Sequence, residues 1–234
     1  MKNNSSRERT EIAFILDRSG SMESCRDATI DGFNQFLREQ QQAKGTARLT
    51  LVLFDDKYLV PTQSIRVQDV SPLNRDSYTT DGATALLDAI GRTINELGAR
   101  LAALLEPERP DQVIISILTD GLENASRRYG WADIASKIEH QTRTYSWTFL
   151  FLGANQDAIA TAARMNITAA NAATYTPGEV GSRASVKAFS RRLVALRHSK
   201  IGVASAGELD DITKPLSVIV EEEDQKQRHA GRLD

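Results

Sequence analysis

Oxygen-bearing side chains follow a short apolar run near the N-terminus, in the segment FILDRSGSM. Asp17 stands at the end of that run, and Ser19 and Ser21 follow it at two-residue spacing. In an open sheet covered by helices on both faces, ligands bind beyond the carboxyl ends of the strands, where the strand order reverses. The segment therefore predicts a ligand site that includes one carboxylate and two hydroxyl groups.

Two further segments carry oxygen donors that could join this site. ISILTDG puts Asp120 just past a second apolar run, and DGATALLDAI puts Thr84 after a glycine turn, at the start of a helical pattern. The predicted site consists of Asp17, Ser19, Ser21, Thr84 and Asp120. All of these donors are oxygens, and hard oxygen ligands favour Mg²⁺ or Mn²⁺ over zinc or copper.

The charge of such a site indicates its use. Mg²⁺ prefers six oxygen ligands at about 2.0–2.1 Å and releases water reluctantly. If the three hydroxyls bind the ion directly and the two carboxylates act through water, the protein ligands in direct contact are neutral. The ion then stays strongly electrophilic, and a Glu or Asp carboxylate of a partner protein would fill its open position. We therefore expect a protein-binding site with no catalytic residues.

Each residue also has an ordinary structural explanation, and two other functions compete. Serine and threonine cap helix N-termini, and Asp-Gly is a common turn. A Mg²⁺-dependent phosphohydrolase of the haloacid dehalogenase type also has an Asp after an apolar strand, and its second Asp serves as general acid. This chain has Ser19 at that place, and a serine hydroxyl cannot serve as general acid near pH 7. The second alternative is a metal that is purely structural.

Four near-continuous apolar runs predict buried strands, because parallel strands covered on both faces lack polar alternation. The runs are EIAFIL (11–16), LTLVLF (49–54), VIISIL (113–118) and WTFLFL (147–152). The irregular stretch around Pro61 and Pro72 predicts a hairpin with an edge strand near Ser64–Val67, and Ala169–Tyr175 could add a last strand. We expect an α/β fold with a doubly wound, mostly parallel central sheet, one antiparallel edge strand and helices on both faces.

Apolar residues at intervals of three and four predict the helices between these strands. The first includes Ile30, Phe33 and Leu37, and a long one runs from Leu87 to Leu104 before two prolines. Further helices are expected around 131–141, 157–164 and 183–198.

The C-terminal part carries two charged features. Arg183, Lys187 and Arg191 recur at four-residue spacing on one side of the last predicted helix. We interpret this basic stripe as a solvated face, with docking of an acidic partner as the alternative. From Glu221 onward the chain is polar and charged, which predicts a disordered tail or a frayed helix.

Composition indicates one globular domain with C-terminal additions. The chain has 234 residues, 41% hydrophobic and 26% charged, and a net charge of −2, without the basic excess typical of nucleic-acid binding. We expect a disordered arm over 1–9, the domain over 10–200 and a C-terminal extension with a charged tail over 201–234. No apolar run is long enough for a signal peptide or a membrane span. Cys25 is the single cysteine and is expected as a free thiol at a helix start, so we expect a cytoplasmic protein.

The three site segments resemble the metal-ion-dependent adhesion site of von Willebrand factor A domains. That site consists of Asp-x-Ser-x-Ser, then a Thr, then an Asp, and FILDRSGSM, GATALLDAI and ILTDG supply these in order. The resemblance covers about residues 10–175. Longer strings, including LVLFDD, TTDGATALLDAI and LTDGLENAS, resemble a group of short, stand-alone bacterial and phage proteins of this type.

The resemblance implies a Mg²⁺-dependent protein-interaction module. In that pattern Ser19, Ser21 and Thr84 contact the metal, while Asp17 and Asp120 act mostly through water. It also leaves open service as an adaptor in a larger complex, such as one built around an AAA+ ATPase.

Four other polar residues lie on the predicted site loops. Asp81, Glu123 and Asn124 would be rim residues of the site, or else ordinary polar residues of a loop. Arg18 follows the first Asp directly, where it would steer acidic partners or have a surface role unrelated to binding.

Overall fold

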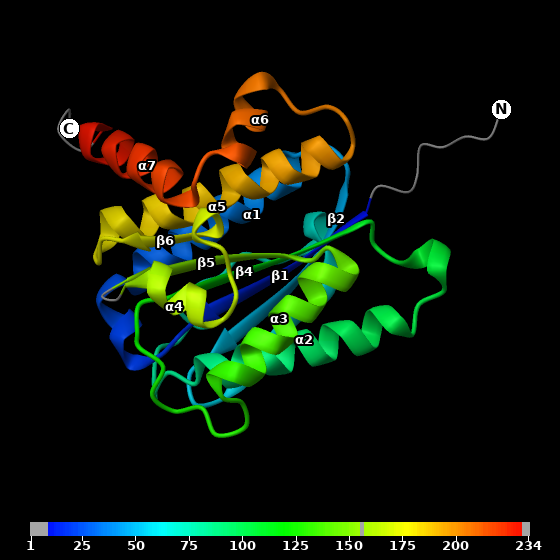
Figure 1. Cartoon of the computed structure of the whole chain (residues 1–234). Helices are drawn as coiled ribbons and strands as arrows, with labels where there is room; N and C mark the ends of the chain where they lie inside the picture. The colour runs from blue at the N-terminus through cyan, green and yellow to red at the C-terminus, as the bar shows by residue number, and fades with distance from the viewer. Residues whose placement is uncertain (1–8, 155–156, 231–234) are drawn as a thin grey trace.

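The computed structural model describes residues 9–154 and 157–230 and shows a central sheet between two layers of helices (Figure 1). In these residues the strand order is β3-β2-β1-β4-β5-β6, with β3 antiparallel to β2 and every other neighbouring pair parallel. The strands are β1 (Arg9–Asp17), β2 (Thr46–Phe54), β3 (Tyr58–Arg66), β4 (Gln112–Thr119), β5 (Thr148–Ala154) and β6 (Ala172–Tyr175). The predicted fold class is confirmed.

Helices cover both faces of the sheet. One side carries α1 (Arg26–Gln42) and α5 (Glu179–Lys200), with α6 (Ala206–Thr213) and α7 (Leu216–Ala230) packed on α5. The other side carries α2 (Leu86–Ala102), α3 (Trp131–Tyr145) and α4 (Ala158–Arg164). Short 3-10 turns are η1 (Gly20–Cys25), η2 (Val67–Asp69), η3 (Glu106–Glu108) and η4 (Ala169–Asn171). Cys25 is a buried free thiol directly before α1, as expected.

The strand β1 shows why its apolar run is continuous. Ile12, Phe14 and Leu16 belong to the core under α1 and α5, whereas Ala13 and Ile15 belong to the core under α2. All five side chains are buried, because each face of the central strand is covered by helices. Burial on both faces holds the end of β1, and hence Asp17, in a fixed place.

The edge strand is longer than predicted and lies earlier in the chain. β3 covers Tyr58–Arg66 instead of Ser64–Val67, and Val67 already belongs to η2. Buried or half-buried and exposed side chains alternate along most of β3, and Pro61 lies within it. Proline is tolerated here because one side of an edge strand needs no partner. The last strand is shorter than predicted, since Ala169–Asn171 forms η4 and β6 begins at Ala172.

The basic stripe on α5 pairs with the chain's own acidic residues, which corrects its interpretation as a solvated face. Lys187 binds Glu39 of α1, and Arg183 lies 3.6 Å from Asp31 of the same helix. The guanidinium of Arg191 contacts three carboxylates of the C-terminal helices, those of Asp211, Glu222 and Glu223, at 2.5–2.9 Å. The stripe therefore holds α1, α6 and α7 around α5.

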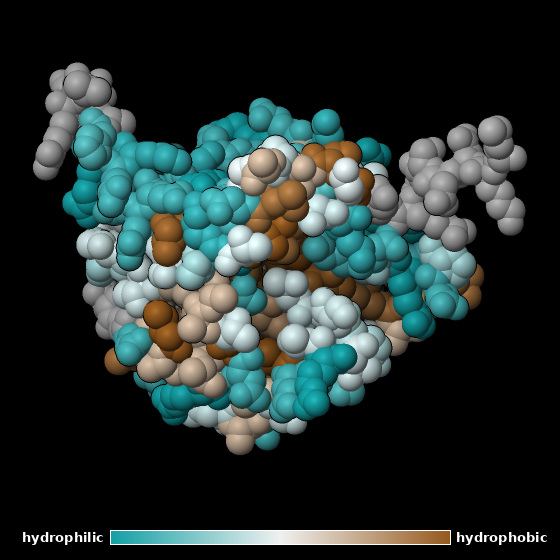
Figure 2. All heavy atoms as spheres, turned by 45° about the horizontal axis from the view of Figure 1, so that its top comes forward, coloured by the Kyte–Doolittle hydropathy of each residue, from teal (hydrophilic) through white to brown (hydrophobic). Residues whose placement is uncertain are grey.

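The segment after Glu221, predicted as a disordered tail or a frayed helix, is helical through Ala230. Leu216, Ile219 and Val220 anchor α7 in the core, and Glu223 is buried against α5. The face in Figure 2 is largely hydrophilic where α7 ends. The expected arm lies outside the described residues except for Arg9, which begins β1. Among the described helices, none combines the length and apolar character needed to cross a bilayer.

Candidate metal centre

The two predicted site carboxylates leave neighbouring strands at the same edge of the sheet. Leu16 of β1 pairs with Leu118 of β4, and Asp17 and Asp120 follow within one or two residues. The chain continues from β1 to α1 on one face and from β4 to α3 on the other, which opens a crevice between these strand ends. Asp17 is fully buried in this crevice, and Asp120 is 5% exposed.

The serine hydroxyls connect the first loop to Asp120. The Oγ atoms of Ser19 and Ser21 lie 3.2 Å apart, and Ser21 Oγ donates a hydrogen bond of 2.5 Å to Asp120 Oδ1. Ser19 is buried, whereas Ser21 is exposed. The hydroxyl of Ser21 therefore lies at the solvent side of the site.

The hydroxyls of Thr84 and Ser21 both lie close to Gly121. A Cβ atom on Gly121 would lie 2.7 Å from Thr84 Oγ1 and 3.5 Å from Ser21 Oγ. The two hydroxyls therefore lie close to the position that a side chain at residue 121 would occupy, where only glycine leaves them room. Thr84 is buried and stands two residues before α2 begins at Leu86.

Backbone hydrogen bonds join the loop after β1 to the loop before α2. Gly20 N donates to Gly82 O at 3.1 Å, and Asp81 N donates to Arg18 O at 2.9 Å. Gly82 has φ +69°, and a Cβ there would lie 2.4 Å from Asp56 Oδ1, so the turn requires glycine. These contacts hold Thr84 beside the two serines.

The three predicted rim residues hold backbone near the site. Asn124 Oδ1 accepts from Thr84 N at 2.9 Å, and Glu123 Oε2 accepts from Leu87 N at 2.9 Å. Asp81 Oδ1 accepts from the amide of Gly82. The first two therefore position Thr84 and the start of α2.

Two residues that support Asp17 were missed by the sequence analysis. Asp17 Oδ1 accepts from Ser19 N at 2.7 Å, while Oδ2 accepts from Thr119 Oγ1 at 2.5 Å. The buried Tyr78 hydroxyl donates to the main-chain oxygen of Asp17 at 2.6 Å. Thr119 could have been found, because it directly precedes Asp120, but no local signal points to Tyr78.

Arg18 does not project from the loop toward partners. It is 8% exposed, and its guanidinium donates to Asp55 Oδ2 at 2.5 Å and to Thr79 Oγ1 at 3.1 Å. Asp55 is fully buried at the end of β2. Arg18 thus braces three loops around the site from inside, so the prediction that it steers acidic partners or lies on the surface is wrong.

The site concentrates negative charge where water is scarce. Burial raises the pKa of Asp17 to about 6, although hydrogen bonds from Thr119 and Ser19 oppose this, and the charge of Asp120 raises it further. Burial also raises the pKa of Asp120, against the hydrogen bond from Ser21. A divalent cation near both groups would favour their charged forms.

The donor set fits a hard cation such as Mg²⁺. Neighbouring oxygens in an octahedral Mg²⁺ shell lie about 3 Å apart, and Ser19 Oγ and Ser21 Oγ are separated by 3.2 Å. Within residues 9–154 and 157–230, no group of three or more His, Cys, Asp or Glu side chains is placed to hold a metal. A metal at this site would therefore need the hydroxyl oxygens as well as the carboxylates. The structure brings the predicted residues together, and their binding of a metal stays a prediction.

Comparison of the sequence with protein-family models and with curated proteins finds no match. Solved structures, however, share the arrangement of strands and helices. A von Willebrand factor type A structure from Catenulispora acidiphila matches with a TM-score of 0.52 at 16% identity, over 81% of this chain and 43% of that one. The fold is that of a von Willebrand factor A domain. Identity at this level shows the fold alone.

Two further structural matches come from a mussel and from Plasmodium vivax. Proximal thread matrix protein 1 from the mussel byssus has a TM-score of 0.54 at 14% identity, over 82% of this chain and 46% of that one. Manganese-loaded Plasmodium vivax TRAP protein has a TM-score of 0.51 at 16% identity, over 76% of this chain and 71% of that one. This chain thus spans about half the length of the mussel and Catenulispora chains.

Proposed function

We propose that this domain is a Mg²⁺-dependent protein-interaction module, with Mn²⁺ as an alternative ion. The metal would bind a Glu or Asp carboxylate of a partner protein. The observation that carries the proposal is the meeting of three hydroxyls and two carboxylates from the loops after β1, before α2 and after β4.

The hydroxyls of Ser19, Ser21 and Thr84 would contact the ion directly. Both oxygens of Asp17 already accept hydrogen bonds from the protein, which favours a role through water for this carboxylate. Asp120 would act in the same way. The ion would then keep its charge largely uncompensated by direct ligands, and the exposed side of the site at Ser21 would admit the partner's carboxylate.

Metal-bound neighbours support a divalent ion at this place in the fold. A second structure of the mussel protein is described as having a zinc-occupied metal-ion-dependent adhesion site, and it matches with a TM-score of 0.52 at 15% identity. The Plasmodium vivax protein is described as manganese-loaded. The proposal of Mg²⁺ for this chain comes from its oxygen-only donors.

We propose no catalytic residue in this site. The phosphohydrolase alternative requires a general acid where Ser19 stands, and that hydroxyl is buried beside Ser21. We further propose a cytoplasmic adaptor, related to short bacterial or phage proteins, that joins a larger complex such as one containing an AAA+ ATPase. Its domain would extend over residues 10–200.

Thermal unfolding tests the metal. We expect Mg²⁺ or Mn²⁺ to raise the unfolding midpoint, EDTA to reverse the rise, and Asp17→Ala to abolish it, because a ligand that binds only the folded state stabilises that state. Asp76→Ala, an exposed aspartate outside the site, is the matched control and should respond like the wild type. A midpoint that ignores both Mg²⁺ and EDTA would contradict the proposal.

Affinity capture separates an adhesive metal from a structural one. The wild-type chain is used as bait with Mg²⁺ and, in parallel, with EDTA at a temperature where the metal-free chain stays folded. Partners that are released by EDTA support the proposal. Partners retained equally in both conditions would show that the metal has a purely structural role.

A further inference from the structure

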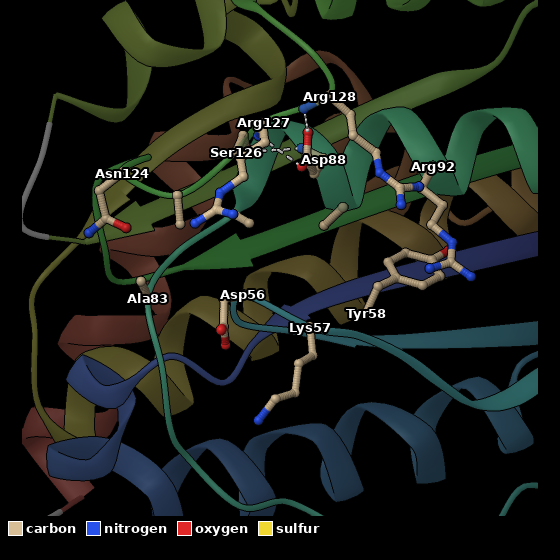
Figure 3. A pocket seen from close by; sticks show the side chains of 13 residues that line it. Asp56, Lys57, Tyr58, Ala83, Asp88, Arg92, Asn124, Ser126, Arg127 and Arg128 are labelled. Atoms are coloured by element: carbon tan, nitrogen blue, oxygen red, sulfur yellow. Dashed lines mark hydrogen bonds between the residues drawn. The ribbon is translucent and has the colours of Figure 1, made fainter.

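A pocket of about 760 Å³ adjoins the candidate metal centre (Figure 3). Ala83 and Ala85, which flank Thr84 in the sequence, line one part of its wall. Asn124 lines another part and accepts a hydrogen bond from the amide of Thr84. A partner segment bound at the metal would therefore lie beside this pocket.

The charged side chains that line the pocket are mostly cationic. The cations are those of Lys57, Arg92, Arg127 and Arg128, and the anions are those of Asp56 and Asp88. In Figure 3, Arg127 extends toward the Ala83 and Asn124 end of the pocket, and Arg128 extends toward Arg92. Asp56 and Lys57 lie across the pocket from the arginines.

Only some of these charges are engaged within the chain. Arg92 pairs with Glu96 at 2.6 Å and lies over the Tyr58 ring at 4.2 Å. Arg127 and Arg128 are exposed, and neither guanidinium forms an ion pair or hydrogen bond with another residue in the described part of the chain. Two guanidinium groups thus face the pocket ready to bind an anion.

The loop that carries these arginines is fixed to α2. The carboxylate of Asp88 accepts hydrogen bonds from the amides of Arg127, Arg128 and Tyr129 at 2.9–3.0 Å. The Tyr129 ring packs on α2 at Gly91, where a Cβ would lie 2.6 Å from the ring. The pocket wall is therefore held in place before any ligand arrives, which lowers the entropic cost of binding.

We propose that this pocket, which we call the arginine pocket, binds a second acidic side chain of the segment that binds the metal. The inference rests on the proposed function and adds the chemistry of the partner: an acidic peptide segment with two separated carboxylates. Arg127, which extends toward the end of the pocket nearest Thr84, would hold the second carboxylate, because the guanidinium fork matches a carboxylate in two parallel hydrogen bonds. Arg128 would add positive charge toward the other end of the pocket. The carboxylate of Asp88 already accepts three amide hydrogen bonds, and Asp56 lies across the pocket from Arg127 and Arg128, so both arginines are left for the partner.

Synthetic peptides test the arginine pocket directly. Each peptide has a Gly-Ser background and one Glu, and a series adds a second Glu at spacings of one to six residues on either side. Binding to the full chain is measured by fluorescence anisotropy in Mg²⁺ and in EDTA. We expect all peptides to require Mg²⁺, and one spacing to bind about tenfold more tightly than the one-Glu peptide, since two partly exposed contacts contribute modestly.

Variants identify the residues responsible. Arg127→Ser/Arg128→Ser should abolish the gain from the second Glu and leave Mg²⁺-dependent binding of the one-Glu peptide. Arg38→Ser/Arg66→Ser removes the same charge from exposed residues outside the pocket and should keep the gain. The gain should also shrink as salt rises, because exposed charges are screened.

The failures of the two proposals are distinguishable. Mg²⁺-dependent binding with no gain from a second Glu at any spacing, or a gain that survives in Arg127→Ser/Arg128→Ser, overturns the arginine pocket alone. No Mg²⁺-dependent binding of any peptide overturns the proposed function and the pocket with it.

Discussion

Thr84 and Gly121 show how the site depends on single atoms. The Thr84 hydroxyl lies within 2.7 Å of the position that a Cβ atom on Gly121 would occupy, and the Ser21 hydroxyl lies 3.5 Å from it. If the proposed function holds, a hydroxyl at residue 84 matters more than the shape of the side chain. A threonine and a valine have nearly the same volume, so substitution separates the two properties.

We predict that Thr84→Val abolishes the Mg²⁺-induced rise in the unfolding midpoint, while Thr84→Ser retains it. At a Mg²⁺ concentration tenfold above Kd, binding stabilises the folded state by about 1.4 kcal/mol, which is about 3–5 °C for a domain of this size. Differential scanning fluorimetry with Mg²⁺ and with EDTA measures the rise in each variant. A full rise in Thr84→Val would show that its hydroxyl is not a ligand.

The buried ion pair between Arg18 and Asp55 is a second feature that depends on single residues. Both side chains are buried, and their charges meet at 2.5 Å. Asp55 Oδ1 also accepts from Lys57 N, so this carboxylate holds the turn between β2 and β3 as well. Removing one partner of such a pair leaves a buried charge without compensation.

We predict that Arg18→Met lowers the free energy of unfolding by about 3–5 kcal/mol, because Asp55 would stay buried without its partner. Adding Asp55→Asn should restore part of the loss. Urea denaturation measures both variants, and Arg75→Ser, which breaks the exposed Arg75–Asp27 pair, should show no measurable loss. If Arg18→Met lowered the free energy of unfolding as little as Arg75→Ser, Arg18 would not stabilise the loops around the site.

At the scale of elements, the first turn of α2 organises the loop between β4 and α3. Asp88 accepts from three successive loop amides, and Ser126 Oγ accepts from the Asp88 amide at 3.0 Å. The loop also carries Asn124, which binds the Thr84 backbone. The helix and the loop therefore form one unit that adjoins both the candidate metal centre and the arginine pocket.

We predict that Asp88→Ala frees this loop without removing the metal. The amides of residues 127–129 should exchange with deuterium faster, and the protein should lose about 1–3 kcal/mol of stability, because three donors lose their acceptor. The Mg²⁺-induced rise in the unfolding midpoint should persist in Asp88→Ala. Asp88→Asn keeps one acceptor oxygen, so its exchange rates and its stability should lie between those of the wild type and Asp88→Ala. Unchanged exchange in Asp88→Ala would mean that other contacts hold the loop.

At the scale of the whole molecule, α5 connects the sheet to the C-terminal helices through ion pairs. Arg191 contacts carboxylates of both α6 and α7, and Lys187 and Ser190 bind Glu39 of α1. Burial raises the pKa of Glu39, but the hydrogen bonds from Lys187 and Ser190 outweigh it and leave the pKa below its ordinary value. The hydrogen bond from Lys214 likewise lowers the pKa of Glu222.

Acid should therefore loosen this assembly. A carboxyl group whose pKa is lower in the folded state contributes stability above its unfolded pKa, near 4.5 for Glu, and loses it as the pH falls through the folded value. We predict that the midpoint of Glu39→Gln falls less than that of the wild type between pH 7 and pH 3.

The comparison with Glu39→Gln is needed because other groups respond oppositely. Burial raises the pKa of Asp17 and of Glu11, so their contributions are present at low pH and are lost as the pH rises through the folded values. Thermal scans of both proteins across the pH range isolate Glu39. Equal acid-induced losses in the two proteins would contradict the prediction.

The sequence by itself determined the sheet and the set of oxygen donors. Continuous apolar runs mark strands buried on both faces, and the rule for ligand crevices places Asp17 and Asp120 together without any knowledge of their contacts. Thr84 followed from its position before a helical pattern. The strands and the meeting of these side chains were predictable because each depends on local periodicity and on where an element ends, whereas metal binding by the side chains stays a prediction.

Only the tertiary structure decided what the charged side chains contact. Arg18 meets Asp55 across 37 positions, Lys187 meets Glu39 across 148, and Asp88 meets the loop amides across 39 to 41. The spacing of charged side chains in the sequence does not name their partners, because each partner is chosen by packing between elements that are distant in the chain. The same reason hid the arginine pocket, since its wall assembles from three separate segments around residues 56–58, 83–92 and 124–128.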